Sequence, residues 1–154
     1  DPRDYQARAN IMWAGTLAHN DICGAGRVQD WASHGIEHEL SALYDCAHGA
    51  GLAVVMPAWM THVHATDDAR FARFARNVFG VGIGASDADA ALAGIDAFRR
   101  WLKSLGLPLT FAELGAREED IPLLVRTLNL SGNTLGGFRP LTESDVDAIY
   151  RLCL

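Results

Sequence analysis

The sequence lacks several features that would point to common classes of protein. It has no apolar run of the ~18 residues that a membrane-spanning helix needs, so no membrane partner is expected. Basic residues are outnumbered, and the net charge of -6 argues against a nucleic-acid partner, because phosphate contacts require a basic surface. The three cysteines, Cys23, Cys46 and Cys153, are an odd set without paired spacing. They exclude a disulfide framework and predict a reduced, cytoplasmic protein.

The composition that remains is that of one globular domain. At 154 residues, 49% hydrophobic and 21% charged, the chain is able to bury a sizeable core. The first residue is an aspartate, and no apolar signal segment precedes the domain. We therefore expect a single domain over residues 1–154, with an upstream segment missing from the chain.

Apolar residues recur at helical spacing along nearly the whole chain, and no strand pattern of useful length is present. Thr66 and Thr142 are expected to cap the helices that follow them. Pro108 interrupts the pattern, whereas Pro122 falls in the first turns of a helix, where proline is tolerated. The sequence predicts an all-α bundle of about seven helices, over residues 5–19, 29–44, 48–60, 66–79, 86–104, 116–130 and 142–152.

The most informative segment, residues 34–49, reads HGIEHELSALYDCAHG and carries three histidines. In a helix, His34 and His38 are four residues apart and share one face, so both are able to face one ion or one ligand. His48 follows a turn-prone stretch and precedes a glycine, which predicts that it starts the next helix and folds back toward His34. Three imidazoles in so short a segment indicate half of a metal site.

A zinc protease is the obvious alternative for two histidines on one helix. Its motif is H-E-x-x-H, in which the glutamate follows the first histidine and acts as general base. Here the order is H-G-I-E-H, so Glu37 directly precedes His38. We expect this position to rotate the carboxylate away from the histidine face, and we reject a protease. Cys46 is expected to behave as a small hydrophobe and not as a thiolate ligand.

The spacing H-x3-H-x9-H-G, followed by GLAVVMP at residues 51–57, resembles the signature of the iron-containing alcohol dehydrogenases. The resemblance is strongest to the branch of butanol dehydrogenases and NADPH-dependent aldehyde reductases, in which an Ile-x-His-x-Leu-Ser-Ala core is usual. The segments NIMWA at residues 10–14, LPLTFAELG at residues 107–115 and EEDI at residues 118–121 also look like parts of this family. The resemblance thus extends over nearly the whole chain.

The resemblance implies the C-terminal helical domain of such an enzyme, with a dehydroquinate synthase-like all-α fold. By position, it implies that His34 and His48 bind a divalent metal, Fe²⁺ or Zn²⁺. It implies that His38 is a catalytic residue that lies beside the bound nicotinamide and relays the alcohol proton. The family's other two metal ligands, an aspartate and a histidine, belong to the segment upstream of this chain.

The N-terminal domain that binds NAD(P) in this family is also absent, as is its Gly-Gly-Gly-Ser phosphate loop. The glycine-rich run over residues 80–84 is predicted to be a loop between helices. The resemblance implies that the parent enzyme is a cytoplasmic homo-oligomer that interconverts small alcohols and aldehydes by hydride transfer. The isolated chain is expected to be inactive, to bind metal weakly and to fold without metal.

Aromatic and basic residues suggest what else surrounds the site. A tryptophan on an apolar stripe usually lies in the core, as we expect of Trp13 and Trp101, but Trp31 lies one turn before His34, and Trp59 lies on the helix that follows His48. Trp31 and Trp59, with Phe138 beside a glycine turn, are candidates to line an alcohol pocket. Arginines at every third position are expected to form the solvated edge of an amphipathic helix: Arg70, Arg73 and Arg76.

Two other functions stay open on the residues alone. In a freestanding metal-binding module, His34, His38 and His48 would form a complete three-nitrogen site, and His34→Ala would release one tightly bound ion. A non-catalytic interaction domain would instead expose an apolar patch and self-associate without metal.

Overall fold

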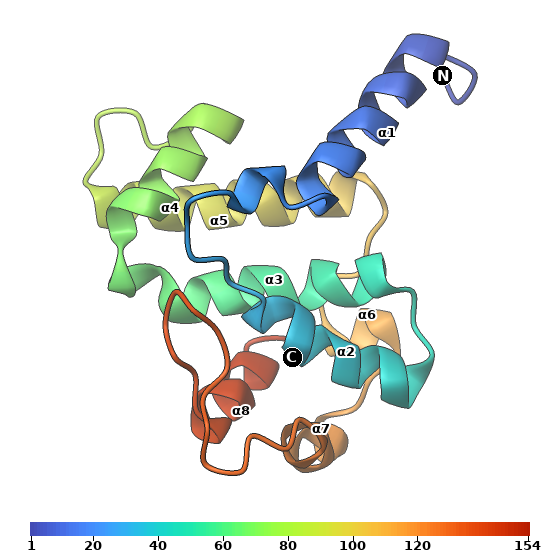
Figure 1. The fold of residues 1–154 in the computed structure, drawn as a ribbon, viewed down its shortest axis with the longest axis vertical. Coiled ribbons are helices and arrows are strands. Elements are labelled where there is room, and N and C mark those ends of the chain that lie inside the picture. The colour runs from blue at the N-terminus through green and yellow to red at the C-terminus, as the bar shows by residue number, and fades with distance from the viewer.

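The structure is a computed structural model that describes residues 1–154, and it confirms the predicted all-α class (Figure 1). No strand is formed, and a single isolated bridge joins Leu135 to Leu141. The α-helices are α1 (Tyr5–His19), α2 (Ala32–Tyr44), α3 (His48–Val63), α4 (Asp68–Phe74), α5 (Asp87–Ser104), α6 (Phe111–Leu114), α7 (Ile121–Thr127) and α8 (Glu143–Arg151). Shorter 3-10 turns are η1 (Ile22–Gly24), η2 (His64–Thr66) and η4 (Glu118–Asp120), and η3 (Ala75–Phe79) is a π-helix.

Helix α3 runs through the middle of the molecule in Figure 1, with α4 and α5 on one side of it and α2, α7 and α8 on the other. Helix α1 projects away from the remainder and contains no buried residue. It exposes large apolar side chains, among them Ile11, Met12 and Trp13. None of the helices combines the length and the apolar composition that crossing a membrane requires.

The core explains how the histidine-bearing helix is held. Ile36 and Leu40 lie four residues apart on α2, are fully buried, and belong to one apolar cluster with side chains of α3 and α8. Burial of each such side chain stabilises the fold by about 1.5–3 kcal/mol. The buried hydroxyl of Tyr150 on α8 donates a hydrogen bond of 2.7 Å to the carbonyl of Ile36. These contacts fix α2 through the face opposite to His34 and His38.

The predicted helix boundaries needed correction in two regions. The helix predicted from Thr66 is capped by Asp67, whose side chain accepts from the backbone N–H of Arg70, and it passes into the π-helix at Ala75. A Cβ on Gly94 of α5 would lie 2.4 Å from the Cβ of Ala75, so the two helices approach as closely as glycine allows there. The helix predicted over residues 116–130 is shorter, because η4 precedes α7.

A short helix was missed in the segment between α5 and η4. Helix α6 begins after Thr110, whose side chain accepts a hydrogen bond from the backbone N–H of Glu113. Four residues are too few to produce a helical apolar period, so this element left no periodic signal. The predicted cap of the last helix is confirmed, because Thr142 and Asp145 form a reciprocal capping box at the start of α8.

The expectation that Trp13 and Trp101 lie in the core was wrong, because Trp13 is 63% exposed and Trp101 is 49% exposed. Trp31, a candidate for the pocket, is 51% exposed. Only Trp59 packs against the apolar core, where it is partly buried. A single sequence does not distinguish an apolar stripe that faces the core from one that no other segment of the chain covers.

The loop between α7 and α8 is anchored at its end by Asp145. This carboxylate accepts hydrogen bonds from the backbone N–H and the hydroxyl of Thr142, and it also contacts His62 Nε2 at 2.8 Å and Arg139 at 2.9 Å. Burial alone would raise the pKa of Asp145. The hydrogen bonds from Thr142 and His62, together with the charge of Arg139, outweigh burial and lower this pKa to about 2.

Asp145→Asn is therefore expected to reduce stability in a pH-dependent way. Because the folded pKa lies below its ordinary value of 3.8, the charged carboxylate stabilises the fold above that pH, and this contribution disappears as the pH falls toward about 2. The stability difference between wild type and Asp145→Asn, measured by urea unfolding, should shrink over this window. Asp147→Asn, which removes an exposed partner of Arg151, is the control. A difference that does not change with pH would contradict this role of Asp145.

Candidate metal centre

Helix α2 has an apolar face and a histidine face, as its sequence requires. Ile36 and Leu40 turn toward the core, and His34 and His38, offset from them by half a turn, lie on the other side. His34 is half-buried and His38 is exposed. The predicted sharing of one face is confirmed, since their ring centroids are 6.4 Å apart.

His48 joins them because the chain reverses directly after α2. Asp45, which ends the helix, has a positive φ of 51°, a conformation that aspartate tolerates better than most residues. Helix α3 then begins at His48, as predicted. The ring centroid of His48 lies 5.3 Å from that of His34 and 5.3 Å from that of His38. The structure therefore brings the three predicted imidazoles together.

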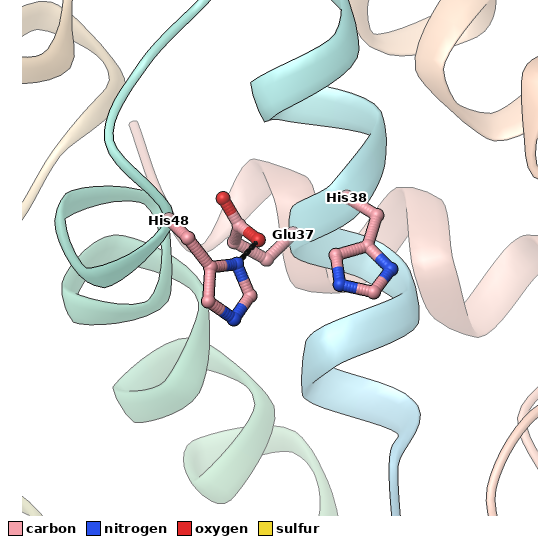
Figure 2. Close-up of side chains that lie close together, drawn as sticks. All are labelled: Glu37, His38 and His48. Carbon is pink, nitrogen blue, oxygen red and sulfur yellow. Dashed lines mark hydrogen bonds and ion pairs between the residues drawn. The ribbon is translucent and has the colours of Figure 1, made fainter.

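Glu37 takes a part in the site that the sequence did not predict, through a contact with His48. The Glu37 side chain is fully buried, and its carboxylate contacts Nδ1 of His48, as Figure 2 shows. The other carboxylate oxygen accepts a hydrogen bond of 2.5 Å from the hydroxyl of Ser41. The carboxylate does not share the face of His34 and His38, but the reversal of the chain carries His48 to it. A carboxylate on one ring nitrogen fixes the tautomer and leaves the other nitrogen free to bind a metal.

Gly51 makes room for this buried carboxylate. A Cβ at Gly51, which lies on the first turn of α3, would be 2.3 Å from Oε1 of Glu37 and 2.8 Å from its Cγ. The close approach of α3 to Glu37 thus requires glycine at position 51. A glycine three residues after His48 could have indicated that another side chain packs closely against the first turn of α3. It does not identify that side chain as Glu37.

His34 is the most unusual imidazole in the cluster. Its Nδ1 atom is buried and has no hydrogen-bond partner, and its ring meets Trp31 edge-on at 4.9 Å. Burial lowers the pKa of His34, and the neighbouring His48 and His38 lower it further. The imidazole is therefore neutral near pH 7, the form in which histidine binds a metal.

The residues present fit an incomplete metal site. Ligand atoms of Glu37, His38 and His48 all lie within 4.8 Å of one another, and His34 stands beside this group with its unpartnered nitrogen. Imidazoles at this separation suit a divalent transition metal such as Fe²⁺ or Zn²⁺. Both carboxylate oxygens of Glu37 already have partners, His48 and Ser41, so the carboxylate is placed to orient the His48 ring.

The remaining residues that the sequence suggested for the site lie in different places. Trp59 and Phe138 lie together, with ring centroids 6.3 Å apart, and both line a large groove. Trp31 contacts His34, as its position predicted. Cys46 is partly buried, with its Sγ 3.8 Å from the hydroxyl of Ser41, and it does not belong to the cluster of ligand atoms.

The fold and the site therefore define an all-α domain in which three imidazoles converge where the chain reverses between two helices. The sequence profile described as "Fe-containing alcohol dehydrogenase family, C-terminal" matches residues 1–154. The chain belongs to this family, as the resemblance implied, and corresponds to the C-terminal part of such enzymes.

Known relatives agree with this assignment. The chain is 37% identical over 150 residues to "NADH-dependent butanol dehydrogenase A" of Clostridium acetobutylicum, covering 96% of this chain and 39% of that protein. It is 38% identical over 153 residues to "NADPH-dependent aldehyde reductase YqhD" of Escherichia coli, covering 97% and 39%. The crystal structure of NADH-dependent butanol dehydrogenase A from Thermotoga maritima superposes with a TM-score of 0.93 at 43% identity, covering 99% of this chain and 40% of that one. The chain thus spans well under half the length of these relatives.

Proposed function

We propose that this chain is the metal-binding domain of an NAD(P)-dependent enzyme that interconverts alcohols and aldehydes. The single observation that carries the proposal is the convergence of His34, His38 and His48 in a chain of this family. The names of the relatives, butanol dehydrogenase and aldehyde reductase, support small alcohols and aldehydes as substrates. One relative is NADH-dependent and the other is NADPH-dependent, so their names leave the choice of cofactor open. We propose Fe²⁺ or Zn²⁺ as the metal.

The roles of the residues follow from their surroundings. His34 and His48 would hold the metal, which supplies a Lewis acid that polarises the carbonyl or alcohol oxygen of the substrate. Glu37 holds the ring of His48 in place through Nδ1. His38 is exposed and, unlike His48, is not held by Glu37, and it would contact the nicotinamide and the substrate and move the alcohol proton.

The remaining parts of the active enzyme would lie outside residues 1–154. We propose that an N-terminal domain binds most of the dinucleotide, and that an upstream aspartate and histidine complete the ligand set. We also propose a homo-oligomer and a cytoplasmic location for the whole protein. The isolated domain should then be inactive.

The intact mass of the polypeptide in its source cells tests this proposal directly. The protein would be captured with an antibody against this domain and weighed by mass spectrometry. A mass more than twice the 16.7 kDa of this chain supports an upstream cofactor domain. The captured protein should then oxidise NADPH or NADH with short aldehydes, and a chelator should abolish this activity.

A freestanding metal-binding module is the second candidate, because the ligand atoms of Glu37, His38 and His48 are already clustered within 4.8 Å. A native mass near 16.7 kDa would favour this module and would reduce the dehydrogenase assignment to shared ancestry. Titration with Zn²⁺ and Fe²⁺ would then show whether the domain alone retains one ion.

A further inference from the structure

A groove of about 1570 Å³ lies between the end of α3, α4 and α5, the segment before α2, and the loop before α8. Ten of its 19 lining residues are hydrophobic. Two of the elements that line the groove also lead to the histidine cluster, namely the segment before α2 and helix α3. Asp30, which lines it, lies four residues before His34, and Met56 lies eight residues after His48, about 12 Å along α3.

One wall of the groove is aromatic. The ring of Phe138 lies 5.7 Å from that of Phe71 and 6.3 Å from that of Trp59, and the guanidinium of Arg70 stands 5.6 Å above it. The three rings come from α3, from α4 and from the loop between α7 and α8, which we call the late loop. The wall therefore exists only when these elements pack together. Its apolar surface suits an alkyl chain or an aromatic group.

Asp30 holds the late loop in this position. One of its carboxylate oxygens accepts hydrogen bonds of 2.8 Å from the backbone N–H groups of Gly137 and Phe138, and the other accepts one of 2.8 Å from Ala32 at the start of α2. A Cβ on Gly137 would lie 2.7 Å from the carbonyl oxygen of Gln29, so the loop packs directly on the chain before α2. The start of the histidine helix and the aromatic wall are therefore rigidly connected.

The charges of the groove are unbalanced in favour of cations. Asp30 is occupied by three backbone N–H groups, and Asp67 caps α4 and faces Arg70. Arg27 and Arg73 also line the groove, and neither guanidinium has a hydrogen-bond or ion-pair partner in the structure. Two free cations beside an apolar wall, in a chain of net charge -6, form a local site for an anion that carries an apolar group.

We propose that this groove binds the non-reacting end of the substrate, and that the substrate class is an aldehyde or alcohol with an apolar chain ending in a carboxylate. The inference rests on the proposed function, because the histidine cluster must then receive the reacting end. The apolar chain lies against Phe138 and Trp59, and the carboxylate pairs with Arg27 and Arg73 at the rim. A phosphate of the dinucleotide has the same anionic chemistry, so the test separates the two sources.

The test compares octanal with suberic semialdehyde, which differs by a terminal carboxylate, in the full-length native enzyme. Wild type should use the semialdehyde more efficiently, with a preference that declines as salt is added. In the double variant Arg27→Gln/Arg73→Gln, kcat/KM for the semialdehyde should fall about 5- to 10-fold, the size expected for two exposed ion pairs. The kcat/KM for octanal should change less than about twofold.

Arg126→Gln is the matched control, because Arg126 is an exposed arginine on α7 that does not line the groove. Equal use of both aldehydes, or equal loss of both in the double variant, would overturn the carboxylate site. A rise in KM for NADPH without a change in aldehyde preference would assign the two arginines to the dinucleotide and would also overturn it. Absence of metal-dependent activity with every aldehyde would instead refute the proposed function itself.

Discussion

His34→Ala in the full-length enzyme is expected to lower kcat/KM for aldehyde reduction by about 10³-fold or more, because a metal ligand is lost and Lewis-acid stabilisation is worth several kcal/mol. Bound metal, measured by mass spectrometry of the purified protein, should fall in parallel. Stability without metal should change by no more than about 1 kcal/mol, since the buried Nδ1 of His34 has no hydrogen-bond partner to lose.

His64→Ala is the control for this experiment. His64 lies just beyond the other end of α3, and its Nδ1 contacts Asp68 at 2.6 Å. This variant should keep its metal and its activity. If His34→Ala retained a full complement of metal, the assignment of His34 as a ligand would be wrong, and the cluster of Glu37, His38 and His48 would become the candidate ligand set.

Glu37→Ala is expected to affect both stability and metal binding. Removal of the buried carboxylate leaves Nδ1 of His48 and the hydroxyl of Ser41 without their partner, and it opens a cavity beside Gly51. We expect a loss of about 2–4 kcal/mol in the free energy of unfolding. Metal affinity should fall about 10- to 100-fold, the range seen when the carboxylate that orients a ligating histidine is removed.

Two further variants make this expectation specific. Glu37→Gln keeps the shape of the side chain, so it should recover much of the stability while metal affinity stays reduced. Glu39→Ala, two positions along α2, removes a partly buried carboxylate for which the structure shows no hydrogen bond, and it should change stability by less than about 0.5 kcal/mol. Equal effects of Glu37→Ala and Glu39→Ala would show that the contact with His48 contributes nothing. Unfolding in urea and competition with a chelator provide the two measurements.

Sequence reasoning succeeded where the signal was local. The periodicity of Ile36 and Leu40 placed α2, and the turn-prone stretch before His48 placed the start of α3. The helix cap at Thr142 was readable for the same reason, because a cap satisfies backbone N–H groups two or three residues away. The family signature is local too, since its histidines fall within one helix and the beginning of the next.

It failed where a contact joins distant segments or where packing decides. The contact between Glu37 and His48 depends on how the chain reverses after α2, and helical spacing alone did not reveal it. The exposed tryptophans failed for a related reason, because an apolar stripe does not reveal whether another segment covers it. The role of Asp30 left no sequence signal at all, because its partners Gly137 and Phe138 lie 107 and 108 residues away.

The sequence by itself therefore determined the all-α class, most of the helices and the family, because each depends on residues within a few turns of one another. The tertiary structure decided which carboxylate supports His48, which apolar surfaces stay open, and that the late loop docks on the start of α2. Those features arise only when helices far apart in the chain pack together. Burial and hydrogen bonding then select partners that no local pattern specifies.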